Sequence, residues 1–325
     1  DVDGAGTLSI GGTGTYNADG QFTAAGNVTF AGAGNLVCSS SADNTFGTLT
    51  NNFGTVTFDA NDGNPQNLPS GVTFNNITVS NTNNLDLAGG VTVNNLLTFT
   101  SGCINTGVNN LTISENGPAV VGATDAAHIN GNCSKIFNNG GASAEFNFPV
   151  GNETLLRPIK LIVPAGASTT FKVKYFHEKS TAVAGASLLN GGGVNGTLNH
   201  ISGYMDPATQ GGGASTGGYY FNVTRPIGSK DAQLYLEWSS ADTWGTGGGA
   251  TESLRFARYN GVTWESAGGT LGGLGQARLG NLTSDAISDF TGVEFTLAST
   301  DIGLFLPIDL VSFDGECIDN QTNLE

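Results

Sequence analysis

The chain has 325 residues, of which 50 are Gly and only 12% are charged, and its formal net charge is −16 at pH 7. All 11 Lys and Arg lie between Lys135 and Arg278, so both ends of the chain are purely acidic, which excludes the clustered cations that nucleic acid or anionic lipid requires. Apolar β-formers recur at short intervals and no window has a helical apolar period, which argues against both disorder and a helical protein.

Residues 1–135 predict an irregular β-solenoid. A phrase of apolar residues around paired Asn occurs at 74–79, 93–99 and 108–113. Asn76, Asn95 and Asn110 mark these phrases at spacings of 19 and 15 residues, which is about one solenoid coil. Gly-rich and Asn-rich turns separate the phrases and suit the corners of a coil. Asn side chains stacked at equivalent turn positions are expected to form ladders.

Residues 136–300 predict an antiparallel β-sandwich. The expected strands lie at 144–150, 155–163, 169–176, 219–224, 232–238, 253–259, 262–265 and 293–298. Turn residues separate these strands, and no helical pattern lies between them. Asn260-Gly261 predicts a hairpin with a two-residue turn.

Residues 301–325 predict a C-terminal extended strand that opens a further, truncated domain. The apolar run at 302–313 has no obvious partner strand, and two interpretations remain open: donation to a neighbouring subunit, or an edge strand of its own sandwich. The residues that would face the partner are Leu304, Leu306, Ile308, Leu310 and Phe313. The chain begins at Asp1 without a signal-peptide pattern, so we expect a segment of a longer precursor. No apolar run is long enough to predict membrane insertion.

The four cysteines are interpreted as disulfide candidates. None forms a Cys-x-x-Cys pair, so zinc and thioredoxin-like sites are not predicted. Cys103 and Cys133 are separated by one or two coils of sequence and are the predicted pair. Cys38 and Cys317 are left open: they could pair with each other, pair across subunits, or stay free.

No catalytic, cofactor-binding or metal-binding residues are predicted. His128, His177 and His200 stand in no metal-ligand pattern. Asp59, Asp62 and Asp86 are the acids that a glycan-cleaving solenoid would use, but they lie in Asn/Gly turns with no Lys or Arg nearby. We therefore expect a protein that is not an enzyme.

The sequence leaves two further ligand hypotheses open. An oxygen-ligand Ca²⁺ site near Asp59 and Asp62 is one of them, although Gly63 and Ser70 break the EF-hand spacing. The other is a surface glycan stacked on exposed aromatic rings, and the rings could equally belong to the sandwich core. The aromatic candidates are Trp238, Trp244, Trp264, Tyr219 and Tyr220.

Several phrases resemble those of a family of secreted Bacteroidota surface proteins. Residues 306–313, Leu-Pro-Ile-Asp-Leu-Val-Ser-Phe, are similar to the phrase that precedes the sorting domain for type IX secretion. Phe148-Pro149-Val150-Gly151 followed by Arg157-Pro158-Ile159 resembles a junction in these proteins, as residues 74–79 and 108–113 resemble their coils. The resemblance implies an extracellular or cell-surface location and a structural or adhesive role. The sorting domain itself does not appear.

The expected function is therefore an extracellular structural or adhesive protein that self-associates into a surface filament, by head-to-tail contacts or by strand donation. The alternative is a monomeric adhesin or carbohydrate-binding module. A polysaccharide-acting β-helix enzyme is the third hypothesis.

Overall fold

A computed structural model gives the fold of the chain. It describes residues 7–50, 54–114, 119–177, 200–202, 220–238, 254–259, 264–276, 279–291 and 293–299. These residues form β-strands joined by turns, with no helix among them, and so the described part of the chain contains no helix that could cross a membrane. The prediction of an all-β protein with an N-terminal solenoid and antiparallel strands after it is confirmed.

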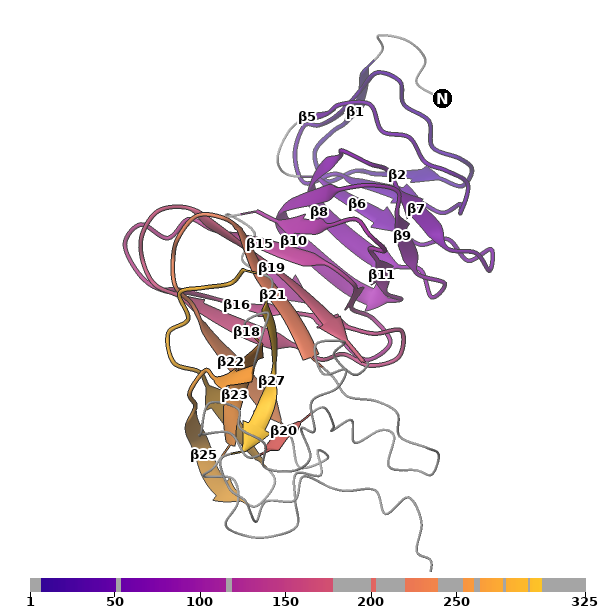
Figure 1. Cartoon of the computed structure of the whole chain (residues 1–325). Helices are drawn as coiled ribbons and strands as arrows, with labels where there is room; N and C mark the ends of the chain where they lie inside the picture. The colour runs from indigo at the N-terminus through magenta and orange to yellow at the C-terminus, as the bar shows by residue number, and fades with distance from the viewer. Residues whose placement is uncertain are drawn as a thin grey trace, which may run out of the picture.

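The solenoid makes about seven turns and builds three parallel sheets (Figure 1). The first is small and contains β1 (Thr7–Ile10), β3 (Asn27–Phe30) and β5 (Leu49–Thr50). The parallel part of the large sheet contains β2 (Thr15–Ala18), β4 (Asn35–Cys38), β6 (Thr55–Phe58), β8 (Thr73–Ser80), β10 (Val91–Ser101), β12 (Leu111–Ile113), β13 (Ala119–Val121) and β15 (Cys133–Phe137). The third contains β7 (Gln66–Leu68), β9 (Leu85–Leu87), β11 (Ile104–Asn105), β14 (Ile129–Asn130) and β17 (Val150–Gly151).

Apolar side chains stack in columns inside the solenoid because the strands are in register. Leu36, Val56, Ile77 and Leu97 are opposite one another on β4, β6, β8 and β10, and all four are buried. The residues between them point outward and carry mainly hydroxyl or amide groups, as alternation along a strand requires. One coil therefore supplies one layer of the core and depends on its neighbours to cover it.

The register departs from the repeat that the Asn phrases suggest. Asn76 is opposite Leu96 and not Asn95, because β10 has a bulge between Val93 and Leu96. The third phrase lies less than one full coil after the second. Leu111 pairs with Val91 in the first half of β10, whereas Leu96 of the second phrase pairs with Ala119. The Asn phrases are therefore signals of coils but not of their alignment.

Coil lengths also vary along the solenoid. In the third sheet, Leu85 pairs with Ile104, and Ile104 pairs in turn with Ile129. The second of these coils is the longer one, and it contains β13, which pairs with the second half of β10. A fixed period therefore cannot place residues in this part of the chain.

The antiparallel sandwich continues from the solenoid without a break in the large sheet. β15 pairs in parallel with β12 on one side and antiparallel with β19 on the other. The large sheet then adds β19 (Thr169–Phe176), β21 (Tyr220–Ile227), β27 (Val293–Ser299), β23 (Leu254–Tyr259) and β24 (Trp264–Ser266), with β20 (His200–Ser202) beside β27. The facing sheet contains β16 (Ala144–Phe148), β18 (Ile159–Val163), β22 (Gln233–Trp238), β26 (Leu279–Thr283) and β25 (Thr270–Gln276).

Two details of the sandwich differ from expectation. The hairpin of β23 and β24 forms, but Tyr259 is opposite Trp264, so the connection is longer than the predicted two-residue turn. The connecting residues 260–263 lie outside the described residues. The sequence does not predict β25 and β26, because their Gly-rich segments have few β-branched or aromatic residues.

Phenylalanine rings hold the sandwich together. Phe171 packs edge-on against Phe137 of β15 at a centroid distance of 5.9 Å and against Phe290 at 5.0 Å. Phe146 and Phe148 of the facing sheet lie 4.9 Å apart in the same edge-to-face arrangement. Because Phe137 belongs to the last solenoid strand of the large sheet, solenoid and sandwich share one hydrophobic core.

Candidate functional site

The two ends of the solenoid are closed differently. At the C-terminal end, β15 is paired with β19, and β17 is followed by a turn in which Arg157 N–H donates to the carbonyl of Val150 at 2.8 Å. At the N-terminal end, β1 and β2 are the outermost strands of their sheets among the described residues. We call the outer side of β1 and β2 the N-terminal edge; Figure 1 shows it at the end of the solenoid remote from the sandwich.

The hydrogen bonds of the first coil show which backbone groups point outward. The carbonyls of Ile10, Gly14 and Ala18 accept from the amides of the next coil at 2.9 to 3.0 Å. Since the amide and carbonyl of one residue in a strand point to the same side, those of Ser9 and Asn17 point away from the protein. The side chains of both residues are also exposed.

Among the described residues, the apolar core is also uncovered at this end. Tyr16 occupies the inward column above Leu36 and is 42% exposed, whereas Leu36 in the next coil is 0% exposed. A coil above the first would bury this ring as the second coil buries the residues below it. The N-terminal edge therefore combines outward-pointing backbone groups with an uncovered core position, which is how a sheet accepts another strand.

The predicted disulfide between Cys103 and Cys133 is wrong for this structure. Cys38, Cys103 and Cys133 are all free and buried. Cys103 directly precedes β11 in the third sheet, whereas Cys133 lies in β15 of the large sheet. Their separation in sequence is thus not a whole number of coils, so the two thiols belong to different sheets. Cys317 lies outside the described residues.

Cys103 is instead next to His128, one coil further along the chain. The Sγ of Cys103 is 3.7 Å from Nδ1 of His128, which is fully buried. Nδ1 also lies 3.0 Å from the carbonyl of Thr124, and Nε2 lies 2.5 Å from the carbonyl of Asn152. Burial favours the neutral ring, but the Cys103 sulfur and the two carbonyls outweigh it, so the pKa of His128 is raised.

This cluster fixes a corner and offers no visible catalytic arrangement. Two backbone carbonyls accept from the ring only if both nitrogens carry protons, so the contacts favour the imidazolium form. Both Cys103 and His128 are buried, and Gly151 approaches so closely that a Cβ there would be 2.7 Å from Nε2. There is no room for a substrate beside the ring on that side.

The three candidate carboxylates connect neighbouring coils. Asp59 accepts from the hydroxyl of Ser39 at 2.8 Å, and Asp86 accepts from the amide of Asn105 at 2.8 Å. Asp62 accepts from the backbone amide of Ser41 at 2.9 Å. Hydrogen bonds from Ser41 and Asn64 lower the pKa of Asp62. Each acid therefore has a structural use in holding the next coil.

A ladder of Asn and Asp side chains forms on the strands of the third sheet, whereas the sequence predicts such ladders at the turns. Asn67, Asp86, Asn105 and Asn130 occupy one outward column on β7, β9, β11 and β14. Asn130 donates to Asn105 at 3.1 Å, and Asn105 in turn donates to Asp86. At the other end of the column, Asn67 donates to Asp43. The ladder ties together coils that the backbone already aligns.

The remaining candidates add no site. His177 contacts Asn152: its Nδ1 lies 3.1 Å from the side-chain amide nitrogen of Asn152. Within the described ranges, no group of three or more His, Cys, Asp or Glu could hold a metal ion. Tyr220 is buried and stacks on Phe176, so it offers no exposed ring. Tyr219, Trp244 and the five candidates of the predicted C-terminal strand lie outside the described residues, as do the side chains of Trp238, Trp264 and His200.

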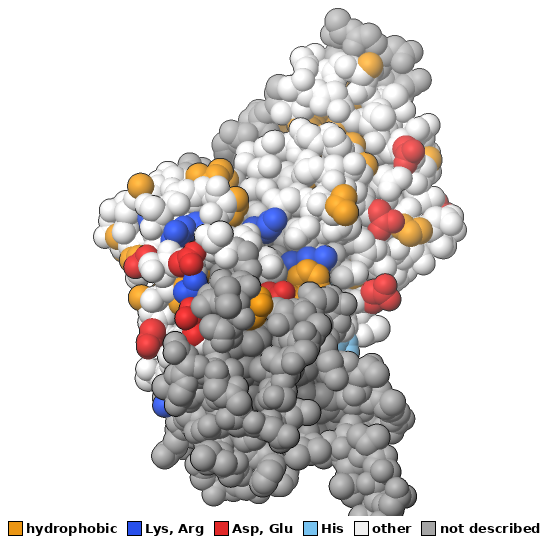
Figure 2. Space-filling view, in the orientation of Figure 1, with side chains coloured by type: hydrophobic (Ala, Val, Ile, Leu, Met, Phe, Trp, Pro, Cys, Tyr) orange, Lys and Arg blue, Asp and Glu red, His pale blue; other side chains and the backbone are white. Residues whose placement is uncertain are grey.

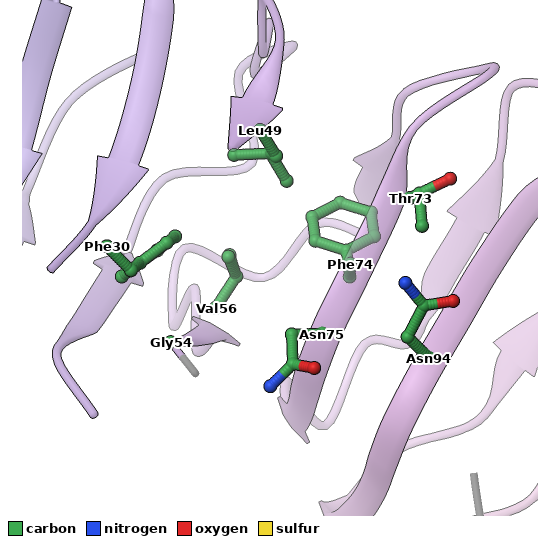
Figure 3. Close-up of a pocket in the computed structure, with 8 residues that line it drawn as sticks. All are labelled: Phe30, Leu49, Gly54, Val56, Thr73, Phe74, Asn75 and Asn94. Atoms are coloured by element: carbon green, nitrogen blue, oxygen red, sulfur yellow. The ribbon is translucent and has the colours of Figure 1, made fainter. Parts of the chain in front are cut away.

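One small cavity opens in the solenoid between the first sheet and the large sheet (Figure 3). Its volume is about 60 Å³, far below the several hundred that enclose a small ligand. It is lined by Phe30, Leu49, Gly54, Val56, Thr73, Phe74, Asn75 and Asn94. This cavity is too small to act as a binding site.

Comparison of the chain with protein-family models, with curated proteins and with solved structures gives no match. The candidate site therefore rests on the geometry of the N-terminal edge. The sequence does not identify the residues of this edge, because Ser9 and Asn17 resemble outward residues of any coil. The signal that could find it is position, since both residues stand in the first coil of the repeats.

Proposed function

We propose that this chain is an extracellular structural or adhesive protein that self-associates through its N-terminal edge. The observation that carries the proposal is the difference between the two ends of the solenoid: one is closed by the sandwich, and the other presents β1, β2 and the exposed ring of Tyr16. A strand from another copy would pair the outward backbone groups and cover the ring at the same time.

The closed C-terminal end restricts how copies combine. A second solenoid cannot stack directly on β15, because β19 already occupies that side of the strand. Two donors fit the N-terminal edge: the same edge of a second copy, which gives pairs, or the apolar segment 302–313 of a second copy, which gives head-to-tail filaments. The extracellular location and the structural or adhesive role are supported by the resemblance to type IX secretion proteins in residues 306–313.

Light scattering over a concentration series tests the proposal. Asn17→Pro removes an outward amide and no intrachain hydrogen bond, and proline is tolerated on the free side of an edge strand. We expect wild type to associate, Asn17→Pro to shift association to higher concentration, and the matched control Asn17→Ala, which keeps the amide, to resemble wild type. A wild type that stays monomeric, or variants that associate alike, would contradict the proposal.

Deletion of 302–325 separates the two donors. If segment 302–313 supplies the strand, the deletion abolishes polymers; if the edges of two copies meet each other, pairs persist. Loss of neither species would show that the tail has no part in assembly.

A further inference from the structure

A second surface of the solenoid adjoins the N-terminal edge, with which it shares the strand β2. The outward residues of β2, β4, β6, β8 and β10 form two columns, one row per coil. The columns contain Thr15, Asn35, Thr55, Asn76 and Leu96 in one and Asn17, Val37, Thr57, Thr78 and Thr98 in the other. We call these ten residues the threonine face.

The rows of the threonine face are in register from coil to coil. Strands of a parallel sheet lie about 4.8 Å apart, and alternate residues along a strand are separated by about 6.6 Å. Thr57, Thr78 and Thr98 are directly opposite one another on successive strands. The side chains therefore repeat in two dimensions, and a partner that is itself a regular lattice matches this repeat over many rows.

The chemistry of this face excludes most lattices. It holds five threonines, three asparagines, one valine and one leucine, with no charged and no aromatic side chain. Figure 2 shows the solenoid surface in that view as largely uncharged and polar, with scattered acids, although the chain carries a charge of −16. An uncharged face suits an uncharged partner, since a charged one would require opposite charges. Sugar rings bind mainly by stacking on aromatic side chains, which this face lacks.

The side chains are also held in place before any partner arrives. Thr57 donates its hydroxyl to Asn35 at 3.0 Å, and the Asn76 amide donates to the carbonyl of Gly54 at 3.1 Å. Threonine is β-branched and has few rotamers, so little side-chain entropy is lost on binding. Each hydroxyl both donates and accepts, and each methyl group excludes water beside it.

We propose that the threonine face binds the ordered water lattice of an ice crystal. Water molecules in ice form an uncharged array of donors and acceptors with a fixed repeat. A rigid array of hydroxyl, amide and methyl groups at regular spacing complements it without charge or stacking. The electrostatic match is the absence of charge on both surfaces. The inference concerns outward side chains, whereas the N-terminal edge concerns the outer backbone groups of β1 and β2, and it does not depend on self-association.

Ice-growth assays with purified protein test this inference. Wild type should inhibit ice recrystallisation and partition into a growing ice front. Thr78→Tyr, in the middle of the face, should lose both activities because the ring disrupts the lattice. The matched control is Thr92→Tyr, an outward threonine in the other half of β10, between Thr73 and Thr112. It should retain both activities, and circular dichroism and melting should show both variants folded.

Two outcomes overturn the proposal. Folded wild type without activity toward ice would do so, as would equal activity of Thr78→Tyr and Thr92→Tyr. A pull-down with microcrystalline cellulose and chitin is the third arm. Binding there without ice activity would assign the face to polysaccharide instead.

Discussion

Replacement of Gly102 by alanine tests the tight contact between successive coils. Gly102 follows β10 with φ +78°, and a Cβ there would lie 1.8 Å from the carbonyl oxygen of Asn81. That carbonyl also accepts from the amide of Asn84 at 3.0 Å, and Asn81 is fully buried, so the oxygen has little freedom to move. Gly63 is the matched control: its φ is +85°, but a Cβ added there would meet no atom within 4 Å.

The expected magnitudes differ because Gly63→Ala carries only one of two costs. A non-glycine residue at positive φ loses about 1–2 kcal/mol. Overpacking of a close contact costs a further 1–3 kcal/mol or so, giving about 2–5 kcal/mol for Gly102→Ala. Urea unfolding followed by circular dichroism measures both variants against wild type. Equal losses for the two variants would refute the claim that the carbonyl of Asn81 contacts this corner.

Three further predictions concern side chains inside or between coils. Asn105→Asp places a carboxylate beside Asp86, so the free energy of unfolding should fall by roughly 1–3 kcal/mol at pH 7 and partly recover at pH 4. An unchanged free energy of unfolding would contradict the hydrogen bond between Asn105 and Asp86. The pKa of His128 is raised above its unfolded value of 6.5. The contribution of His128 to the free energy of unfolding is therefore complete below pH 6.5 and is lost as the pH rises through the folded pKa. Urea titrations of wild type and His128→Gln should converge at high pH and separate at low pH. Burial raises the pKa of the Cys38 and Cys133 thiols to about 12, and for Cys38 the nearby Asp59 contributes. Iodoacetamide at pH 8 should therefore label both cysteines slowly in folded protein and rapidly in urea without reductant. Cysteines that mass spectrometry finds unlabelled in urea would indicate a disulfide.

Local pattern is enough to predict the coils. The alternation around Val28 and Phe30, or Val56 and Phe58, predicts strands with one buried face, and all four residues are buried. Pattern does not give the register, because the bulge before Leu96 is defined only by its partner strand. The third Asn phrase looks like the first two, yet Asn109 and Asn110 lie in a corner before β12, whereas the Asn pairs of the first two lie inside β8 and β10.

Long-range pairing is beyond the sequence for a related reason. The disulfide prediction assumes coils of even length between Cys103 and Cys133, but the longer coil that follows Cys103 places His128 beside it. Likewise, the sequence of β15 does not indicate that its outer side pairs with β19, which begins only at Thr169. Which end of the solenoid is closed by the sandwich is therefore seen only in the structure.

Images of single particles test the central claim most directly. Negative-stain electron microscopy at increasing concentration should show copies joined through the solenoid end remote from the sandwich. Particles that remain isolated at every concentration, or that meet only through their sandwiches, would contradict an assembly role for the N-terminal edge.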